Sequence, residues 1–83
     1  MRHPTVSIVI PAYECAATIE RVIQCLLQQT YTPHEIIIVD DGSTDQTAQI
    51  IQSFPEVIYL SQKNAGPAVA RNRGAFQATG DMI

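Results

Sequence analysis

The chain alternates short β-branched runs with helix-like segments three times, and this alternation constrains its fold more than any other feature. The apolar runs lie at residues 6–10, 35–39 and 57–60. The first helix-like segment has apolar residues at positions 19, 22, 23, 26 and 27, the spacing that lines one face of a helix and predicts a core-facing stripe. Strand–helix alternation is typical of parallel strands joined by right-handed crossovers. The sequence therefore predicts an α/β fold, a three-layer, doubly wound, mostly parallel sheet of the Rossmann-like kind.

Turn and cap residues set the expected bounds of these elements. Pro11 is expected to end the first strand. Helices are expected over residues 16–29, over 46–53 with Asp45 as N-cap, and from Pro67 to about 78. Residues 79 and 80 would end the third helix, and residues 81–83 would begin a fourth strand. The single domain expected over residues 1–83 is therefore incomplete, cut at the start of its fourth strand.

Composition and charge exclude several classes of partner. The net charge of −3 argues against nucleic acid, because non-specific binding depends on neutralising phosphates. Cys15 and Cys25 match neither a zinc spacing nor a Cys-x-x-Cys pair, so both are expected to be free thiols. No apolar run approaches the roughly 18 residues of a membrane span. The segment is expected to be cytoplasmic, with any association with the cytoplasmic face of a membrane made through other parts of its protein.

Ligands of such sheets bind beyond the carboxyl ends of the strands, which directs attention to the loops at 11–15, 40–45 and 61–67. Asp40 and Asp41 stand side by side after the second strand. Neighbouring carboxylates disfavour each other's ionisation unless something binds them. One is expected to hold the turn through backbone N–H groups and the other to bind a ligand, and the sequence leaves open which does which.

Three blocks of the chain resemble family 2 glycosyltransferases with the GT-A fold: VSIVIPAYE (6–14), EIIIVDDGSTD (35–45) and NAGPAVARNRG (64–74). Their order and spacing match the family, and TGD at 79–81 matches the usual lead-in to the next block. The resemblance covers nearly all 83 residues. It implies an inverting enzyme that takes sugar from a nucleotide-diphosphate sugar, with UDP as the expected nucleotide, as in bacterial-type polysaccharide biosynthesis. It leaves the donor sugar and the acceptor open.

The resemblance also implies roles for residues after the first strand. Pro11, Ala12 and Tyr13 would form a shelf beside the base of the nucleotide, although packing of the Tyr13 ring over the sheet edge is an equal alternative. Glu14 would lie near the base or the ribose. Asp41 would accept a hydrogen bond from the ring N–H of the base, a donor that uracil has and cytosine lacks.

Further roles follow for Asp40, the other acidic residue of the pair, and for the third helix. Asp40 is the near-equal rival of Asp41 for the contact with the base. Arg71 would face the base and the diphosphate, with a guanidinium suited to anionic oxygens. Arg73 points about 200° away on a helix and is expected to be a solvated surface charge. The nearby Asn72 and Gly74 are expected to pack the helix on the sheet.

The resemblance places the family's metal motif, Asp-x-Asp, and its catalytic base after residue 83. These 83 residues are therefore expected to hold no catalytic or metal-binding residue, and to be inactive alone although the full enzyme uses Mn²⁺ or Mg²⁺. The nucleotide-diphosphate sugar is the expected partner. A sheet edge left open beside the first strand would favour a homo-oligomer.

Two alternatives belong to other classes. A receiver-type signalling domain also carries an acidic pair after a strand, but there the pair follows the first strand and not the second. A non-enzymatic nucleotide-binding module is the other, although the chain has neither a Gly-x-Gly-x-x-Gly nor a Walker loop to support it.

Overall fold

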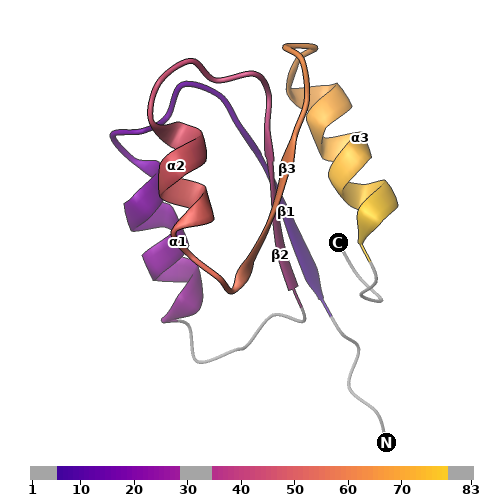
Figure 1. Cartoon of the computed structure of the whole chain (residues 1–83). Helices are drawn as coiled ribbons and strands as arrows, with labels where there is room; N and C mark the ends of the chain where they lie inside the picture. The colour runs from indigo at the N-terminus through magenta and orange to yellow at the C-terminus, as the bar shows by residue number, and fades with distance from the viewer. Residues whose placement is uncertain (1–5, 29–34, 79–83) are drawn as a thin grey trace, which may run out of the picture.

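The computed structural model describes residues 6–28 and 35–78, in which three strands alternate with three helices (Figure 1). In chain order the elements are β1 (Ser7–Ala12), α1 (Ile19–Leu27), β2 (Glu35–Asp40), α2 (Thr47–Gln52), β3 (Val57–Ser61) and α3 (Pro67–Gln77). The strands pair in the order β1-β2-β3, and both pairs are parallel. The predicted α/β fold is confirmed.

The helices lie on both faces of the sheet: α1 and α2 on one and α3 on the other (Figure 1). The central strand β2 supplies both cores, because its alternate side chains point to opposite faces. Ile36 and Ile38 pack in the cluster that includes Ile23 of α1, whereas Ile37 and Val39 pack with Ala70 of α3 and its surroundings. Burial on both faces explains the unbroken β-branched run of β2.

Helix α1 begins at Ile19, three residues later than expected. The N–H groups of Thr18 and Ile19 donate to the carbonyl oxygen of Cys15, so the preceding residues form a turn. Ile19 and Ile23 are buried, as the apolar stripe predicts, but Val22 and Leu27 are 40% and 38% exposed. The middle of the apolar stripe is therefore buried in the core, and its flanks are partly exposed.

Two predicted boundaries are wrong by one or two residues. Strand β1 continues through Pro11 to Ala12, where Pro11 lies opposite Val39. Proline is tolerated there because β1 is an edge strand in the described part of the chain, paired only with β2. The N-cap position of α2 is Gln46 and not Asp45. The Asp45 carboxylate nevertheless accepts the Thr47 N–H at 2.9 Å and also the Thr47 hydroxyl, so it still holds the start of the helix.

Gly74 lets α3 lie close to the sheet. It is buried, and a Cβ atom at this position would overlap Cγ1 of Val9 and approach Cγ2 of Val39 to 3.3 Å. The prediction that Gly74 packs the helix is confirmed. The same prediction is wrong for Asn72, which is exposed.

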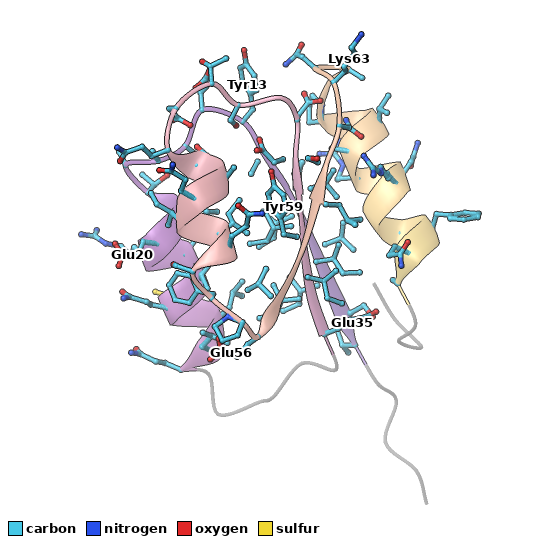
Figure 2. The ribbon with its side chains drawn as sticks, in the orientation of Figure 1. Tyr13, Glu20, Glu35, Glu56, Tyr59 and Lys63 are labelled. Carbon is cyan, nitrogen blue, oxygen red and sulfur yellow. The ribbon has the colours of Figure 1, made fainter. Side chains whose placement is uncertain are left out.

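The ends of the three strands are level, which brings their following loops together. Ala12 is in register with Asp40, and Asp40 with Ser61. Figure 2 shows the result: Tyr13 and Lys63 lie at one end of the molecule and Glu35 and Glu56 at the other. The fourth strand that the sequence predicts from residue 81 lies outside the described residues. The carboxyl ends of β1, β2 and β3 lie together at the end that carries Tyr13 and Lys63, where ligands of parallel α/β sheets bind.

Candidate functional site

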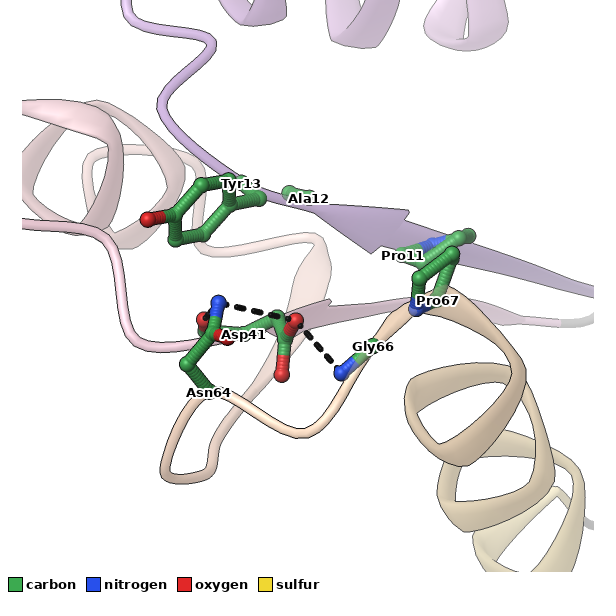
Figure 3. A pocket seen from close by; sticks show the side chains of 7 residues that line it. All are labelled: Pro11, Ala12, Tyr13, Asp41, Asn64, Gly66 and Pro67. Carbon is green, nitrogen blue, oxygen red and sulfur yellow. Dashed lines mark hydrogen bonds between the residues drawn. The ribbon is translucent and has the colours of Figure 1, made fainter.

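A pocket of about 380 Å³ opens at this end of the sheet, beyond β1 and β2 (Figure 3). Its volume lies within the roughly 300–1,000 Å³ of small-molecule sites. The lining residues are Pro11, Ala12, Tyr13, Asp41, Asn64, Gly66 and Pro67. The structure thus brings together four of the seven residues that the sequence suggested, and it leaves Glu14, Asp40 and Arg71 outside the lining.

Tyr13 contributes an aromatic ring to the pocket. Its side chain is 53% exposed, so it is not packed away against the sheet. In Figure 3 the ring lies over the side of the pocket where Asn64 and Asp41 meet. A half-exposed ring in this position offers a flat surface on which a planar ligand can stack.

The Asp41 carboxylate fastens the loop between β3 and α3. One oxygen, Oδ1, accepts the Gln62 side-chain amide and the Ala65 N–H, both at 2.8 Å. The other, Oδ2, accepts the Gly66 N–H at 3.0 Å and the Asn64 amide at 3.3 Å. A carboxylate has about four lone-pair sites, and all are engaged here. The Gln62 bond, followed by the backbone N–H groups, lowers the pKa of Asp41, which is therefore ionised at neutral pH.

Asp40 has the other role that the sequence left open. It is buried, its Oδ1 accepts the Ser43 N–H at 3.0 Å, and its Oδ2 accepts the Tyr59 hydroxyl at 3.1 Å. Burial and the bond to Asp40 raise the pKa of Tyr59, which keeps that hydroxyl a donor. Asp40 therefore holds the turn after β2, and Asp41 is the member of the pair that reaches the pocket.

Glu14 joins the first two loops. Its carboxylate accepts the Thr44 hydroxyl at 2.7 Å and the N–H groups of Thr44 and Asp45 at 3.3 and 3.2 Å. Its own N–H donates to the Ser43 hydroxyl at 2.9 Å. Its φ of 50° lies in the left-handed region, which is uncommon for a residue other than glycine and is maintained here by these bonds. The Glu14 carboxylate, which was expected beside the base or the ribose, is thus hydrogen-bonded to the loop after β2.

The two arginines of α3 differ in their contacts. Arg73 donates through Nη1 to the carbonyl oxygen of Ser61, at the end of β3. It is exposed, as expected, but it is not a free surface charge. Arg71 is also exposed and lies four residues after Pro67, which lines the pocket. Residues four apart lie on one face of a helix, so Arg71 is on the face of α3 that begins at the pocket.

Three lining residues, Asn64, Gly66 and Pro67, belong to the loop at 61–67 that was expected beside the ligand, but none of them was named as a site residue. The signal that was available is the composition of their loop: Asn-Ala-Gly-Pro before a helix supplies backbone N–H groups and a glycine, and Gly66 has a φ of 101°. An acidic residue at the end of the neighbouring strand needs such donors. The acidic pair after β2 was expected to provide one ligand contact, and the bonds that the Asp41 carboxylate makes to the β3–α3 loop are not visible in the sequence of either segment alone.

Metal and membrane features can be assessed for the described residues. Among residues 6–28 and 35–78 there is no group of three or more His, Cys, Asp or Glu side chains arranged to hold a metal ion. Cys15 and Cys25 are free, as predicted. None of the helices described is long and apolar enough to cross a membrane.

Comparison with known proteins agrees with this architecture. Residues 7–83 match the family model for glycosyl transferase family 2. The chain is 42% identical to the uncharacterized glycosyltransferase YibD of Escherichia coli K12, over 93% of this chain and 24% of that protein. It is 48% identical to an Escherichia coli chondroitin synthase, over 99% of this chain and 12% of the synthase. The chain thus spans less than a quarter of either relative.

A solved structure gives the same result for the fold. The mannosyltransferase PcManGT of Pyrobaculum calidifontis, in complex with GDP-Man and Mn²⁺, superposes with a TM-score of 0.79 and 28% identity. The match covers 96% of this chain and 26% of that protein. The fold is that of GT-A glycosyltransferases, and the receiver-type alternative is set aside. With the family model matched from Ser7 onward, the chain belongs to glycosyl transferase family 2.

Proposed function

We propose that this chain is the nucleotide-binding part of an enzyme that transfers sugar from a UDP-linked donor, with inversion at the anomeric carbon. One observation carries the proposal: the pocket at the carboxyl ends of β1 and β2 sets the ionised Asp41 beside the half-exposed ring of Tyr13. Such a pair suits a flat base, which can stack on the ring and donate an N–H group to the carboxylate in place of one of its present donors. The similarity to a mannosyltransferase solved with the nucleotide sugar GDP-Man supports this class of ligand.

Within this proposal the residues outside the pocket lining also have roles. Arg71 interacts with the diphosphate, because its exposed guanidinium lies one helical turn after Pro67 and offers a fork of donors to anionic oxygens. Glu14 and Asp40 act on the nucleotide through the loops that they hold. Pro11 and Ala12 form the floor of the shelf on which the base rests.

A divalent cation, Mn²⁺ or Mg²⁺, belongs to the proposed full enzyme, where it would neutralise charge on the departing diphosphate. The described residues do not fit such an ion, since they provide no ligand set for it. Their part is to bind and orient the nucleotide, and neither metal nor base chemistry is assigned to them. The 83-residue chain is therefore expected to bind UDP-sugars without transferring or hydrolysing them.

Weak binding of UDP is the first expected result. The contacts with the base lie in the described pocket, but nothing there neutralises the diphosphate in full, so the affinity is expected to be on the order of millimolar, about 4 kcal/mol. NMR titration of the chain with UDP should shift amide signals of residues 11–14 and 40–43. Signals of α1, which contributes no residue to the pocket lining, serve as the internal control. Absence of shifts at residues 11–14 and 40–43 up to saturating UDP would contradict the proposal.

We also propose that the chain associates through the outer edge of β1. In the described part of the chain β1 pairs only with β2, and an unpaired strand edge presents N–H and C=O groups that recruit another strand. Light scattering at increasing concentration should show dimers or larger species. A monodisperse monomer at high concentration, with the β1 amides exchanging freely with solvent, would disprove this association.

A further inference from the structure

Asn64 lines the ligand pocket beside the Asp41 carboxylate. It is exposed and lines the pocket, and its amide nitrogen donates both to the main-chain oxygen of Asp41, at 3.1 Å, and to Oδ2, at 3.3 Å (Figure 3). The other three bonds to the carboxylate measure 2.8, 2.8 and 3.0 Å. The bond from Asn64 to Oδ2 is the longest of the four and lies beyond the usual range of roughly 2.7–3.2 Å.

This long bond is the one that a ligand can replace with the least loss. The backbone N–H groups of Ala65 and Gly66 are fixed by the loop, and Gln62 bonds the other oxygen. A ligand N–H that reaches Oδ2 from the pocket takes the place of one Asn64 N–H. Asn64 then keeps its bond to the main-chain oxygen of Asp41, and the N–H that it has released lies beside the ligand.

After this exchange the pocket presents two complementary groups side by side: an acceptor, the carboxylate oxygen of Asp41, and a donor, the amide of Asn64. The matching edge of a ligand carries an N–H group next to a carbonyl oxygen. Uracil and guanine have such an edge. Cytosine has instead an unprotonated ring nitrogen next to an amino group, so with its ring seated as that of uracil its acceptor would face the carboxylate and its donor would face the Asn64 amide.

We propose that Asn64, paired with Asp41, determines which base the site accepts, selecting bases with a ring N–H next to a carbonyl. The proposal rests on the proposed nucleotide-binding function and adds to it a residue that reads the base. The mismatch with cytosine would leave polar groups of a partly buried site unpaired, and such mismatches discriminate more strongly than a lost apolar contact does.

The test compares the binding of UDP, CDP and 3-methyl-UDP by NMR titration. The unaltered chain should bind UDP about tenfold more tightly than CDP or 3-methyl-UDP, because these lack the ring N–H that would replace the Asn64 bond to Oδ2. Asn64→Ala and Asn64→Leu, the second of similar size to asparagine, should both reduce the UDP/CDP ratio by roughly fivefold, the typical effect of one hydrogen bond. Lys63→Ala, next to Asn64 and exposed, is the matched control and should leave the ratio unchanged.

The outcomes separate this inference from the proposed function. If both Asn64 variants weaken UDP and CDP equally, Asn64 only shapes the loop and the inference is wrong, although nucleotide binding stands. If 3-methyl-UDP binds as tightly as UDP, the ring N–H is not read and the inference is wrong as well. If the unaltered chain binds no nucleotide at all, the proposed function fails, and this inference fails with it.

Discussion

Gly74→Val is expected to lower the free energy of unfolding by about 3 kcal/mol, the upper end of the range for overpacked cores. The Cβ atom alone would overlap Cγ1 of Val9, and the Val39 side chain on the neighbouring strand leaves little room to move away. Helix α3 must then shift off the sheet and open the cluster of Ile37, Val39 and Ala70. A domain of this size has a total stability of only about 4–12 kcal/mol, so the loss is large.

Urea unfolding of the purified variants measures this effect. Asn72→Val is the matched control, because it places the same side chain on the same helix at an exposed position, and its effect should stay within about 0.5 kcal/mol. Adding Val9→Ala to Gly74→Val should recover part of the loss, since it removes the atom that the new side chain would overlap. Equal stability of the Gly74 and Asn72 variants would show that α3 does not lie as close to β1 as described.

Asp41→Asn is expected to weaken UDP binding at least about tenfold, because replacing one carboxylate oxygen affects both the β3–α3 loop and the contact with the base. The new amide group replaces one carboxylate oxygen and turns N–H groups toward the donors of the β3–α3 loop, two of which are backbone N–H groups. The wall of the pocket formed by Asn64 and Gly66 then loses its anchor, and the base loses a charged acceptor. Asp45→Asn is the matched control: its carboxylate also has a lowered pKa, because of its bond to Thr47, but it does not line the pocket. If UDP binds equally to both variants, Asp41 has no part in the site.

The same substitution should change how stability depends on acid. The pKa of folded Asp41 is lowered from its ordinary value of 3.8, so its ionised form stabilises the folded state. That contribution is fully present well above pH 3.8 and is lost as the pH falls through the lower pKa of the folded chain. The stability difference between the unaltered chain and Asp41→Asn should therefore shrink on acidification. A difference that stays constant down to the acid limit would mean that the charge of Asp41 does not stabilise the loop.

The sequence predicted those features that depend on one segment at a time. Alternating β-branched runs identify parallel strands because β2 is buried on both faces, and Gly74 is identifiable because a helix close to a sheet needs a residue without a side chain. Features that depend on two segments were not predictable in the same way. The bonds of Glu14 join residues about 30 apart in the chain, and those of Asp41 reach Asn64 and Gly66.

The candidate site shows the same division. Pro11, Ala12, Tyr13 and Asp41 follow strand ends, and strand ends are visible in the sequence. The family resemblance implied that Glu14 lies near the base or the ribose, but its left-handed backbone and its partners turn it toward Thr44. Pro11 was expected to end β1, although an edge strand can continue through proline.

The order of the strands has a consequence for synthesis on the ribosome. Each strand pairs with the one made before it, β2 with β1 and β3 with β2, so no strand of the described sheet waits for a distant partner. Every group that lines the pocket, from Pro11 to Pro67, has emerged once α3 begins to form. Domains fold as units from the N-terminus during translation at roughly 5–20 residues per second. In a longer polypeptide the pocket would therefore be complete before the segments that follow it are made, and any ligand that binds it would stabilise the folded part of the nascent chain.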